Sequence, residues 1–131
     1  MQAVMIQAVH PVLMARDVES SVQFFGQLGF RLVFADVPTA PRYAIVARDG
    51  CELHLQWQDP AQWQGSRDRP TYRFLVANVD LFFQELQAFG LVPPAAPSAS
   101  PWATPGDTPW GTREFHLHDP AGNGLQFYRP L

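Results

Sequence analysis

The chain has 131 residues, which is enough for one hydrophobic core and too few for two independent ones. Its hydrophobic fraction of 47% and charged fraction of 16% exclude an intrinsically disordered chain. The net charge is −3, all nine basic residues are arginines and no basic run occurs, which argues against a nucleic-acid-binding surface. The single cysteine, Cys51, excludes an intramolecular disulfide and a cysteine-rich zinc module.

The N-terminal segment MQAVMIQAVHPVLMARD is apolar but has no leading positive charge. His10 and Pro11 interrupt it, and the chain contains no apolar run of the roughly 18 residues that a membrane span needs. We therefore expect a strand here rather than a signal peptide or a membrane span, and a cytoplasmic protein with no membrane partner.

An internal repeat relates residues 17–33, DVESSVQFFGQLGFRLV, to residues 78–94, NVDLFFQELQAFGLVPP. The two segments align without a gap, so that Gly29 matches Gly90. Each predicts a short helix that ends at its glycine. The apolar spacing predicts buried positions on both helices: Val22, Phe25 and Leu28 on the first, and Phe82 or Phe83, Leu86 and Phe89 on the second.

Strand-like runs surround both helices. Residues 9–16 and 71–78 precede them, and residues 30–36, 42–50 and 51–58 follow the first helix. The second helix is followed by LVP, a proline-rich loop over residues 93–111, and then runs at 111–118 and 122–129. The pattern predicts an α+β fold in one domain, residues 1–131, with module one at about 1–60, a linker at about 61–69 and module two at about 70–131.

Alternation along the strands predicts a polar and an apolar face. The apolar faces are expected to carry the helices, and the polar faces to form one concave surface suited to a ligand. We take as candidate ligand-binding residues on these faces Glu52, His54, Arg73, Glu114, His116, Gln126 and Tyr128. Trp102 and Trp110, in the proline-rich loop, are expected to pack at a dimer interface or to stack on a flat ligand.

Two phrases carry a resemblance to a known family: PVLMARDVESSVQFFGQLGF near the start and PWGTREFHLHDPAGNGLQFY near the end. The chain resembles the vicinal oxygen chelate superfamily, which includes glyoxalase I, extradiol dioxygenases, fosfomycin-resistance enzymes and bleomycin-resistance proteins. The resemblance implies two βαβββ modules forming a curved mixed sheet. The second phrase is closest to the bleomycin-resistance branch, which implies a homodimer that sequesters a small molecule between subunits, without a cofactor or a catalytic residue.

The enzymes of this superfamily hold a metal at up to four strand positions, which correspond here to His10, Glu52, Thr71 and Gln126. Only His10 and Glu52 are good ligands, because a threonine hydroxyl and a glutamine carbonyl are weak donors. The alternative hypothesis is that the chain binds a divalent metal such as Ni, Mn, Fe or Zn, with His116 or His118 completing the site. The chain would then be a glyoxalase-like lyase, an isomerase or a dioxygenase.

Simpler roles are also open. His10, counted among the ligand-binding candidates, and Glu52 can form a hydrogen-bonded pair without a metal. Arg73 can anchor an anionic substrate or neutralise Glu52 or Glu114. Residues 119–123, DPAGN, predict a hairpin turn. A purely structural module with a filled cavity is a third possibility. We favour sequestration of a planar or cationic ligand, the function that antibiotic-resistance proteins of this branch perform.

Overall fold

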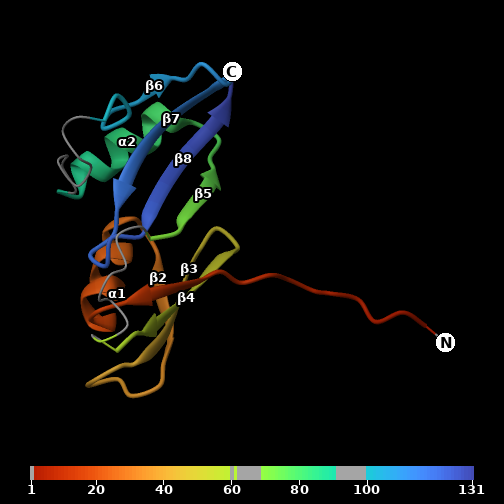
Figure 1. Ribbon diagram of the computed structural model, residues 1–131, viewed down its shortest axis with the longest axis vertical. Coiled ribbons are helices and arrows are strands. Elements are labelled where there is room, and N and C mark those ends of the chain that lie inside the picture. Colours follow the sequence, from red (N-terminus) through yellow and green to blue (C-terminus); the bar gives the residue numbers. More distant parts are fainter. Residues whose placement is uncertain (1, 60, 62–68, 91–99) are drawn as a thin grey trace.

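The computed structural model describes residues 2–59, 61, 69–90 and 100–131. Two copies of the same arrangement follow each other along the chain (Figure 1). The elements of the first are β1 (Val12–Ala15), α1 (Val18–Gln27), β2 (Arg31–Ala35), β3 (Tyr43–Arg48) and β4 (Cys51–Trp57). Those of the second are β5 (Thr71–Leu75), α2 (Val79–Ala88), β6 (Gly106–Asp107), β7 (Thr112–His118) and β8 (Gly124–Pro130).

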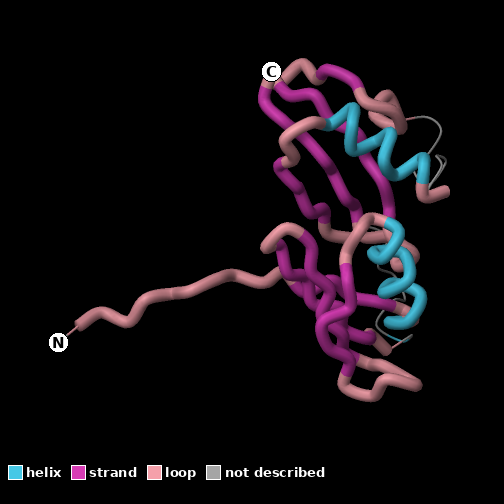
Figure 2. Tube along the Cα trace, turned by 180° about the vertical axis from the view of Figure 1, so that it is seen from behind, coloured by secondary structure: helices cyan, strands magenta, loops and turns pink. Residues whose placement is uncertain are grey.

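The strands form two four-stranded sheets with the orders β1-β4-β3-β2 and β5-β8-β7-β6. In each sheet the first strand is parallel to the last strand of its module, and the remaining pairs are antiparallel. The α+β fold of two βαβββ modules is thus confirmed. Both helices lie on the same side of the sheets (Figure 2), so the opposite faces carry no helix.

The N-terminal strand is shorter than predicted. It begins at Val12, whereas residues 2–11 belong to no strand, and the chain before His10 stands away from the body of the molecule (Figure 1). Parts of other expectations, namely the LVP run, the start of the proline-rich loop and most of the linker, lie outside the described residues. Within the described part of the chain, no helix is long and apolar enough to span a membrane.

The helix ends follow the sequence signals. Asn78 caps α2 by accepting a hydrogen bond from the Leu81 backbone N–H at 3.0 Å. Gly29 and Gly90 follow the two helices with φ of +86° and +82°, a conformation that favours glycine. One residue departs from expectation: the prediction that Phe89 is buried is wrong, since its side chain is 61% exposed. The helix ends at Ala88, so Phe89 lies outside the regular turn that buries Leu86.

A single cluster of buried apolar side chains runs through both modules. Phe25 and Leu28 enter it from the first module as predicted, while Val22 is only partly buried. Phe115 and Phe127 stack within it at 5.2 Å between ring centroids. The core thus lies between the sheets and their helices, and the polar residues of the strands are left on the opposite faces.

Candidate functional site

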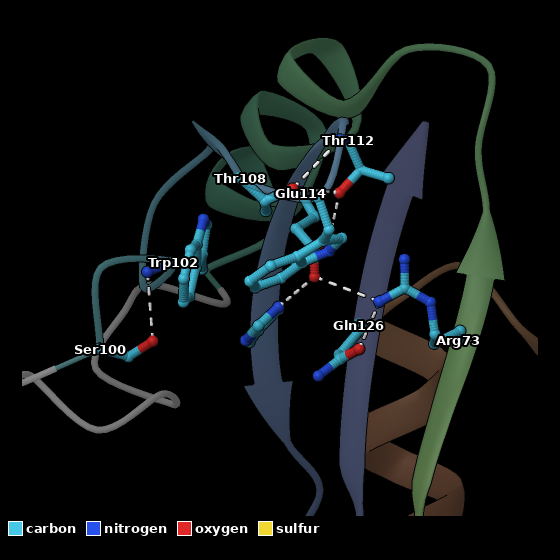
Figure 3. A network of polar contacts seen from close by, with 9 residues as sticks. Arg73, Ser100, Trp102, Thr108, Thr112, Glu114 and Gln126 are labelled. Atoms are coloured by element: carbon cyan, nitrogen blue, oxygen red, sulfur yellow. Dashed lines mark hydrogen bonds and ion pairs between the residues drawn. The ribbon is translucent and has the colours of Figure 1, made fainter. Parts of the chain in front are cut away.

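The open face of the second sheet is built around Glu114, a carboxylate with no exposed surface (Figure 3). Its Oε1 accepts hydrogen bonds from Thr112 Oγ1 at 2.5 Å and from the Trp110 indole N–H at 3.1 Å. Its Oε2 accepts from His116 Nε2 at 2.5 Å and from an Arg73 N–H at 3.3 Å. β7 supplies three of these residues, and their alternation along it directs Thr112, Glu114 and His116 to one face.

The charge on Glu114 is decided by these donors. Burial alone would raise the pKa of the carboxyl group, because it disfavours the ionised form. The hydrogen bonds from Thr112, His116, Arg73 and Trp110 outweigh burial and lower the pKa of Glu114 to about 2. The open face therefore has a fixed negative charge beneath it at neutral pH.

Arg73 balances part of that charge from strand β5, which is separated from β7 by β8. Besides its contact with Glu114, it donates a hydrogen bond to Gln126 Oε1 at 2.6 Å. Its guanidinium group lies 4.0 Å from the centre of the Tyr128 ring, which is a cation–π distance. The contact with Glu114 corresponds to the neutralising role considered for Arg73, and contact with a ligand stays a prediction.

Aromatic rings stand beside the carboxylate. Trp102 lies 5.1 Å from Trp110 and 5.5 Å from His116, measured between ring centroids. The backbone carbonyl of Trp102 accepts a hydrogen bond from the His116 N–H at 2.8 Å, which attaches the loop to β7. Trp110 is 56% exposed. Trp102, Trp110 and His116 are called here the aromatic cluster, and they present ring surface to the outside of the sheet.

A second group of polar residues lies on the open face of the first sheet. His54 Nε2 is 3.0 Å from Glu52 Oε1, and His10 Nε2 is 3.8 Å from Glu52 Oε2. The two imidazole rings stack at 4.9 Å, and Tyr43 Oη lies 2.5 Å from Nδ1 of His54. The residues His10, Glu52 and His54 are called here the histidine group.

The histidine group is a cluster that could hold a divalent metal. One ligand atom from each of its three residues lies within 4.8 Å of the others. Two imidazoles and a carboxylate are a donor set that transition metals accept, and the hydrogen bond to Tyr43 would fix the orientation of the His54 ring. The expected hydrogen bond between His10 and Glu52 is not formed, since 3.8 Å separates His10 Nε2 from Glu52 Oε2 and the carboxylate is bonded to His54 instead. His54 is the third donor that the sequence prediction had not assigned to the metal.

The candidate residues lie on two different sheets. Among the described residues the strands form two sheets, so Glu114 and its neighbours belong to the open face of one and the histidine group to the open face of the other. Whether these faces act as one surface stays a prediction. His116 is bound to Glu114 and His118 is exposed on the second sheet, so neither completes the first group.

Two contributors were missed from the sequence. Tyr43 reaches His54 because β3 and β4 are antiparallel neighbours, with Ile45 directly opposite His54 in the register. Thr112 lies two residues before Glu114 on the same face of β7, and this period-two spacing was a usable signal. The hydroxyl of Thr108 contacts that of Thr112 at 2.8 Å and extends the network into the loop.

A duplicated strand–helix–sheet unit with titratable side chains on its open faces is the architecture of a glyoxalase-type domain. The chain belongs to the glyoxalase/bleomycin resistance protein/dioxygenase superfamily, whose family model matches residues 7–127. The suspected superfamily is thereby confirmed. No curated protein sequence matches the chain.

Solved structures share the fold. A bleomycin resistance determinant encoded on the transposon Tn5 superposes with a TM-score of 0.73 at 22% identity, covering 95% of this chain and 98% of that one. A bleomycin-binding protein from Streptomyces verticillus, complexed with copper(II)-bleomycin, has a TM-score of 0.70 at 25% identity, with coverage of 98% and 100%. Lactoylglutathione lyase from Agrobacterium tumefaciens also matches, with a TM-score of 0.64, 17% identity and 95% coverage of both chains.

Proposed function

We propose that this protein sequesters a planar, cationic small molecule without a chemical step. The aromatic cluster is the observation that carries the proposal. The exposed face of Trp110 and the neighbouring ring of Trp102 offer stacking surface, and a ligand cation gains further from contact with the indole faces. The similar bleomycin-binding protein is a complex with copper(II)-bleomycin, which makes that class of ligand the first to test.

The charge beneath the aromatic cluster favours the same ligand class. Glu114 is ionised at neutral pH, and its charge is shared with Arg73 at a long distance of 3.3 Å. The chain as a whole is also negative, with a net charge of −3. The protein as a whole therefore favours a cationic ligand over an anionic one, while Arg73 offsets part of the local charge of Glu114.

A homodimer completes the cleft in this proposal. The two open faces of one chain lie on different sheets, so each presents only half of a cleft. A second copy placed across them brings the histidine group of one copy opposite the aromatic cluster of the other, with two equivalent clefts per dimer. The homodimer predicted from the sequence is part of this proposal.

The test is a titration with bleomycin, metal-free and as the copper(II) complex, followed by tryptophan fluorescence and calorimetry. We expect saturable binding that weakens at least tenfold in Trp110→Ala and is unchanged in Trp57→Phe. Trp57 is a suitable control because it lies on β4 under the guanidinium group of Arg42, at 4.3 Å from its ring centroid. Equal affinity of Trp110→Ala and wild type would contradict the assignment of the site.

The histidine group supports a second candidate, a metal-dependent lyase, isomerase or dioxygenase. His10, Glu52 and His54 would hold the ion, and the ion would polarise oxygen atoms of the substrate. Calorimetric titration of Ni²⁺, Mn²⁺ and Zn²⁺ into chelator-stripped protein tests this candidate. One saturable site per chain, lost in Glu52→Ala together with turnover of thiol adducts or catechols, would favour it over sequestration.

A further inference from the structure

The carboxylate of Glu52, on the open face of the first sheet, has one bonded and one unbonded oxygen atom. Its Oε1 lies 3.0 Å from Nε2 of His54, which is a hydrogen-bond distance. Its Oε2 lies 3.8 Å from Nε2 of His10, which is too long for a hydrogen bond. The side chain of Glu52 is 36% exposed, so a donor from outside the chain can reach the carboxylate.

Two further contacts hold that carboxylate in place. A carboxylate has no proton to donate, so Nε2 of a neutral His54 ring carries the hydrogen and Nδ1 is left as an acceptor. The Tyr43 hydroxyl lies 2.5 Å from Nδ1 and donates to it. The His10 ring stacks on the His54 ring, with 4.9 Å between centroids and 14° between planes. The residues Tyr43, His54 and Glu52, called here the Tyr43–His54–Glu52 triad, therefore orient the carboxylate before any ligand arrives.

No arginine that the structure describes contacts Glu52, whereas Arg73 contacts Glu114 at 3.3 Å. Within the described part of the chain, both ion pairs of Glu52 are with imidazoles, which are charged only when protonated. Arg31 lies on the same face, in register with Ala47, which pairs with Glu52. It forms no ion pair with the carboxylate among the described residues. Glu52 is therefore a carboxylate that a cation from outside the chain can neutralise.

Apolar side chains lie beside this acceptor. Val12 of β1 and Ile45 of β3 lie directly opposite His54 on its two sides. Phe34 of β2 lies opposite Ile45. Side chains in register share one face of a sheet, and those of Val12 and Phe34 are 37% and 48% exposed. A cation carried on an apolar body gains contact here that a hydrated inorganic ion does not, so the surroundings favour an organic cation.

The carboxylate on the other sheet cannot serve in the same way. Glu114 has no exposed surface, and four donors already occupy its two oxygen atoms. A ligand on Trp110 therefore finds ring surface there but no oxygen of Glu114 for its own N–H groups. Across the cleft of the proposed homodimer, Oε2 of Glu52 offers that acceptor.

We propose that Glu52 is the cation-binding residue of the cleft, with Oε2 accepting a hydrogen bond from a protonated nitrogen of the ligand. The planar ring of the same ligand lies on Trp110 of the second copy. This arrangement favours planar aromatic amines and amidines that are protonated at neutral pH and carry N–H groups. The inference rests on the proposed function and deepens it by naming the residue and the kind of nitrogen that meets it. Tyr43 and His54 are positioning residues, since they act through Glu52.

The first experiment compares 9-aminoacridine, which at mildly alkaline pH is a planar cation with N–H groups, with acridine, which is uncharged there. Fluorescence titrations are made in buffer with EDTA, so that no metal ion occupies the histidine group. We expect wild type to bind 9-aminoacridine at least about tenfold more tightly than acridine, because a charge-assisted hydrogen bond forms only with the former. Glu52→Gln should remove that preference and leave the affinity for acridine unchanged.

The matched control is Glu19→Gln. It removes the same charge from an exposed position on α1, so the preference for 9-aminoacridine should be kept. The control separates the local contact at Glu52 from the attraction that the net charge of the chain exerts on any cation. A preference that is equal in wild type and Glu52→Gln would overturn the proposal, as would an equal loss of both compounds in that variant.

A second pair of variants keeps the charge of Glu52 and changes only its support. Tyr43→Phe removes the hydroxyl that bonds to His54, so the preference for 9-aminoacridine should fall about threefold while acridine binds as before. Tyr72→Phe is the control, since its hydroxyl bonds instead to the Val12 carbonyl at 3.1 Å, and it should leave the preference unchanged. A general loss of structure would weaken the binding of both compounds together, so the ratio of the two affinities reports the positioning role. An unchanged ratio in Tyr43→Phe would contradict that role.

The proposed function and the cation-binding residue fail in distinguishable ways. Equal affinity of wild type for both compounds, lowered for both in Trp110→Ala, would keep the aromatic cluster as the site and reject Glu52. A preference that depends on Glu52 but not on Trp110 would support Glu52 and count against the aromatic cluster. A wild type that binds neither compound would count against both.

Discussion

The indole N–H of Trp110 donates a hydrogen bond to Oε1 of Glu114 across 3.1 Å, joining a ring that is 56% exposed to a carboxylate that is fully buried. The ring that would meet a ligand is therefore held by a charge that the ligand cannot touch. In the proposed function this arrangement would make Glu114 a positioning residue, since its effect on binding would act through Trp110 and its neighbours.

Substituting Glu114→Gln tests this role. The amide keeps the size of the side chain but brings an N–H₂ group against donors such as Arg73 and His116, so that a buried position holds donors facing donors. We expect a loss of about 2 to 4 kcal/mol in the free energy of unfolding and weaker ligand binding. Urea unfolding and fluorescence titration measure both. Glu19→Gln on the exposed side of α1 is the control and should change neither.

The depressed pKa of Glu114 predicts a pH dependence of stability. The folded-state pKa of about 2 lies below the ordinary value of 4.5, so the unfolded chain binds the proton more readily between these values. The resulting stabilisation, up to about 3 kcal/mol, is complete above pH 4.5 and is lost as the pH falls towards 2. The difference in unfolding free energy between wild type and Glu114→Gln should shrink over that range. A difference in unfolding free energy that stays constant with pH would contradict the predicted contribution of the ionised Glu114.

The repeated helix-ending glycines offer a matched pair of substitutions. A Cβ at Gly29 would lie 2.7 Å from Nη1 of Arg48, whereas a Cβ at Gly90 meets nothing within 4 Å. Both residues have positive φ, so Gly90→Ala should cost about 1 kcal/mol of unfolding free energy through the backbone alone. Gly29→Ala should lower the unfolding free energy by more than Gly90→Ala does. This excess should disappear when Gly29→Ala is made in a chain that already carries Arg48→Ala. Thermal or urea unfolding of the four variants measures this coupling.

The turn at residues 119–123 carries a contact between the modules. The side-chain N–H₂ of Asn123 donates to the Met14 carbonyl on β1 at 2.9 Å and to Asp119 Oδ2 at 2.8 Å. Asn123 is fully buried, so Asn123→Ala leaves both acceptors without this donor. We expect a loss of about 1 to 3 kcal/mol in unfolding free energy, measured by urea denaturation. Gln23→Ala, on the exposed side of α1, is the control.

Local signals in the sequence were sufficient for most of the elements, although β6 (Gly106–Asp107) lies within the predicted loop at residues 93–111 and β1 is shorter than predicted. The glycines at 29 and 90 ended both helices as predicted, and period-two alternation placed Leu53 and Leu55 inside and His54 on the open face. The hairpin turn predicted at 119–123 is present, with Asp119 accepting hydrogen bonds from the Ala121 and Asn123 backbones at 3.0 and 2.8 Å.

The local sequence signals did not predict which distant segments of the chain lie side by side. Periodicity assigns a residue to a face but does not say which faces meet, so the separation of the histidine group from the aromatic cluster was not foreseen. The stacking of His10 on His54 depends on the register of β1 with β4, in which Val12 lies opposite His54.

The network around Glu114 also has a consequence for the thermodynamics of binding. Trp110, Arg73 and His116 are tied to one carboxylate before any ligand arrives. Their rotamer freedom is thus removed during folding rather than at the moment of association, where immobilising each such side chain otherwise opposes binding by about 0.5 to 1.5 kcal/mol. The receptor is preorganised, and the entropic penalty of recognition falls mainly on the ligand, so a rigid planar ring system suits it better than a flexible chain.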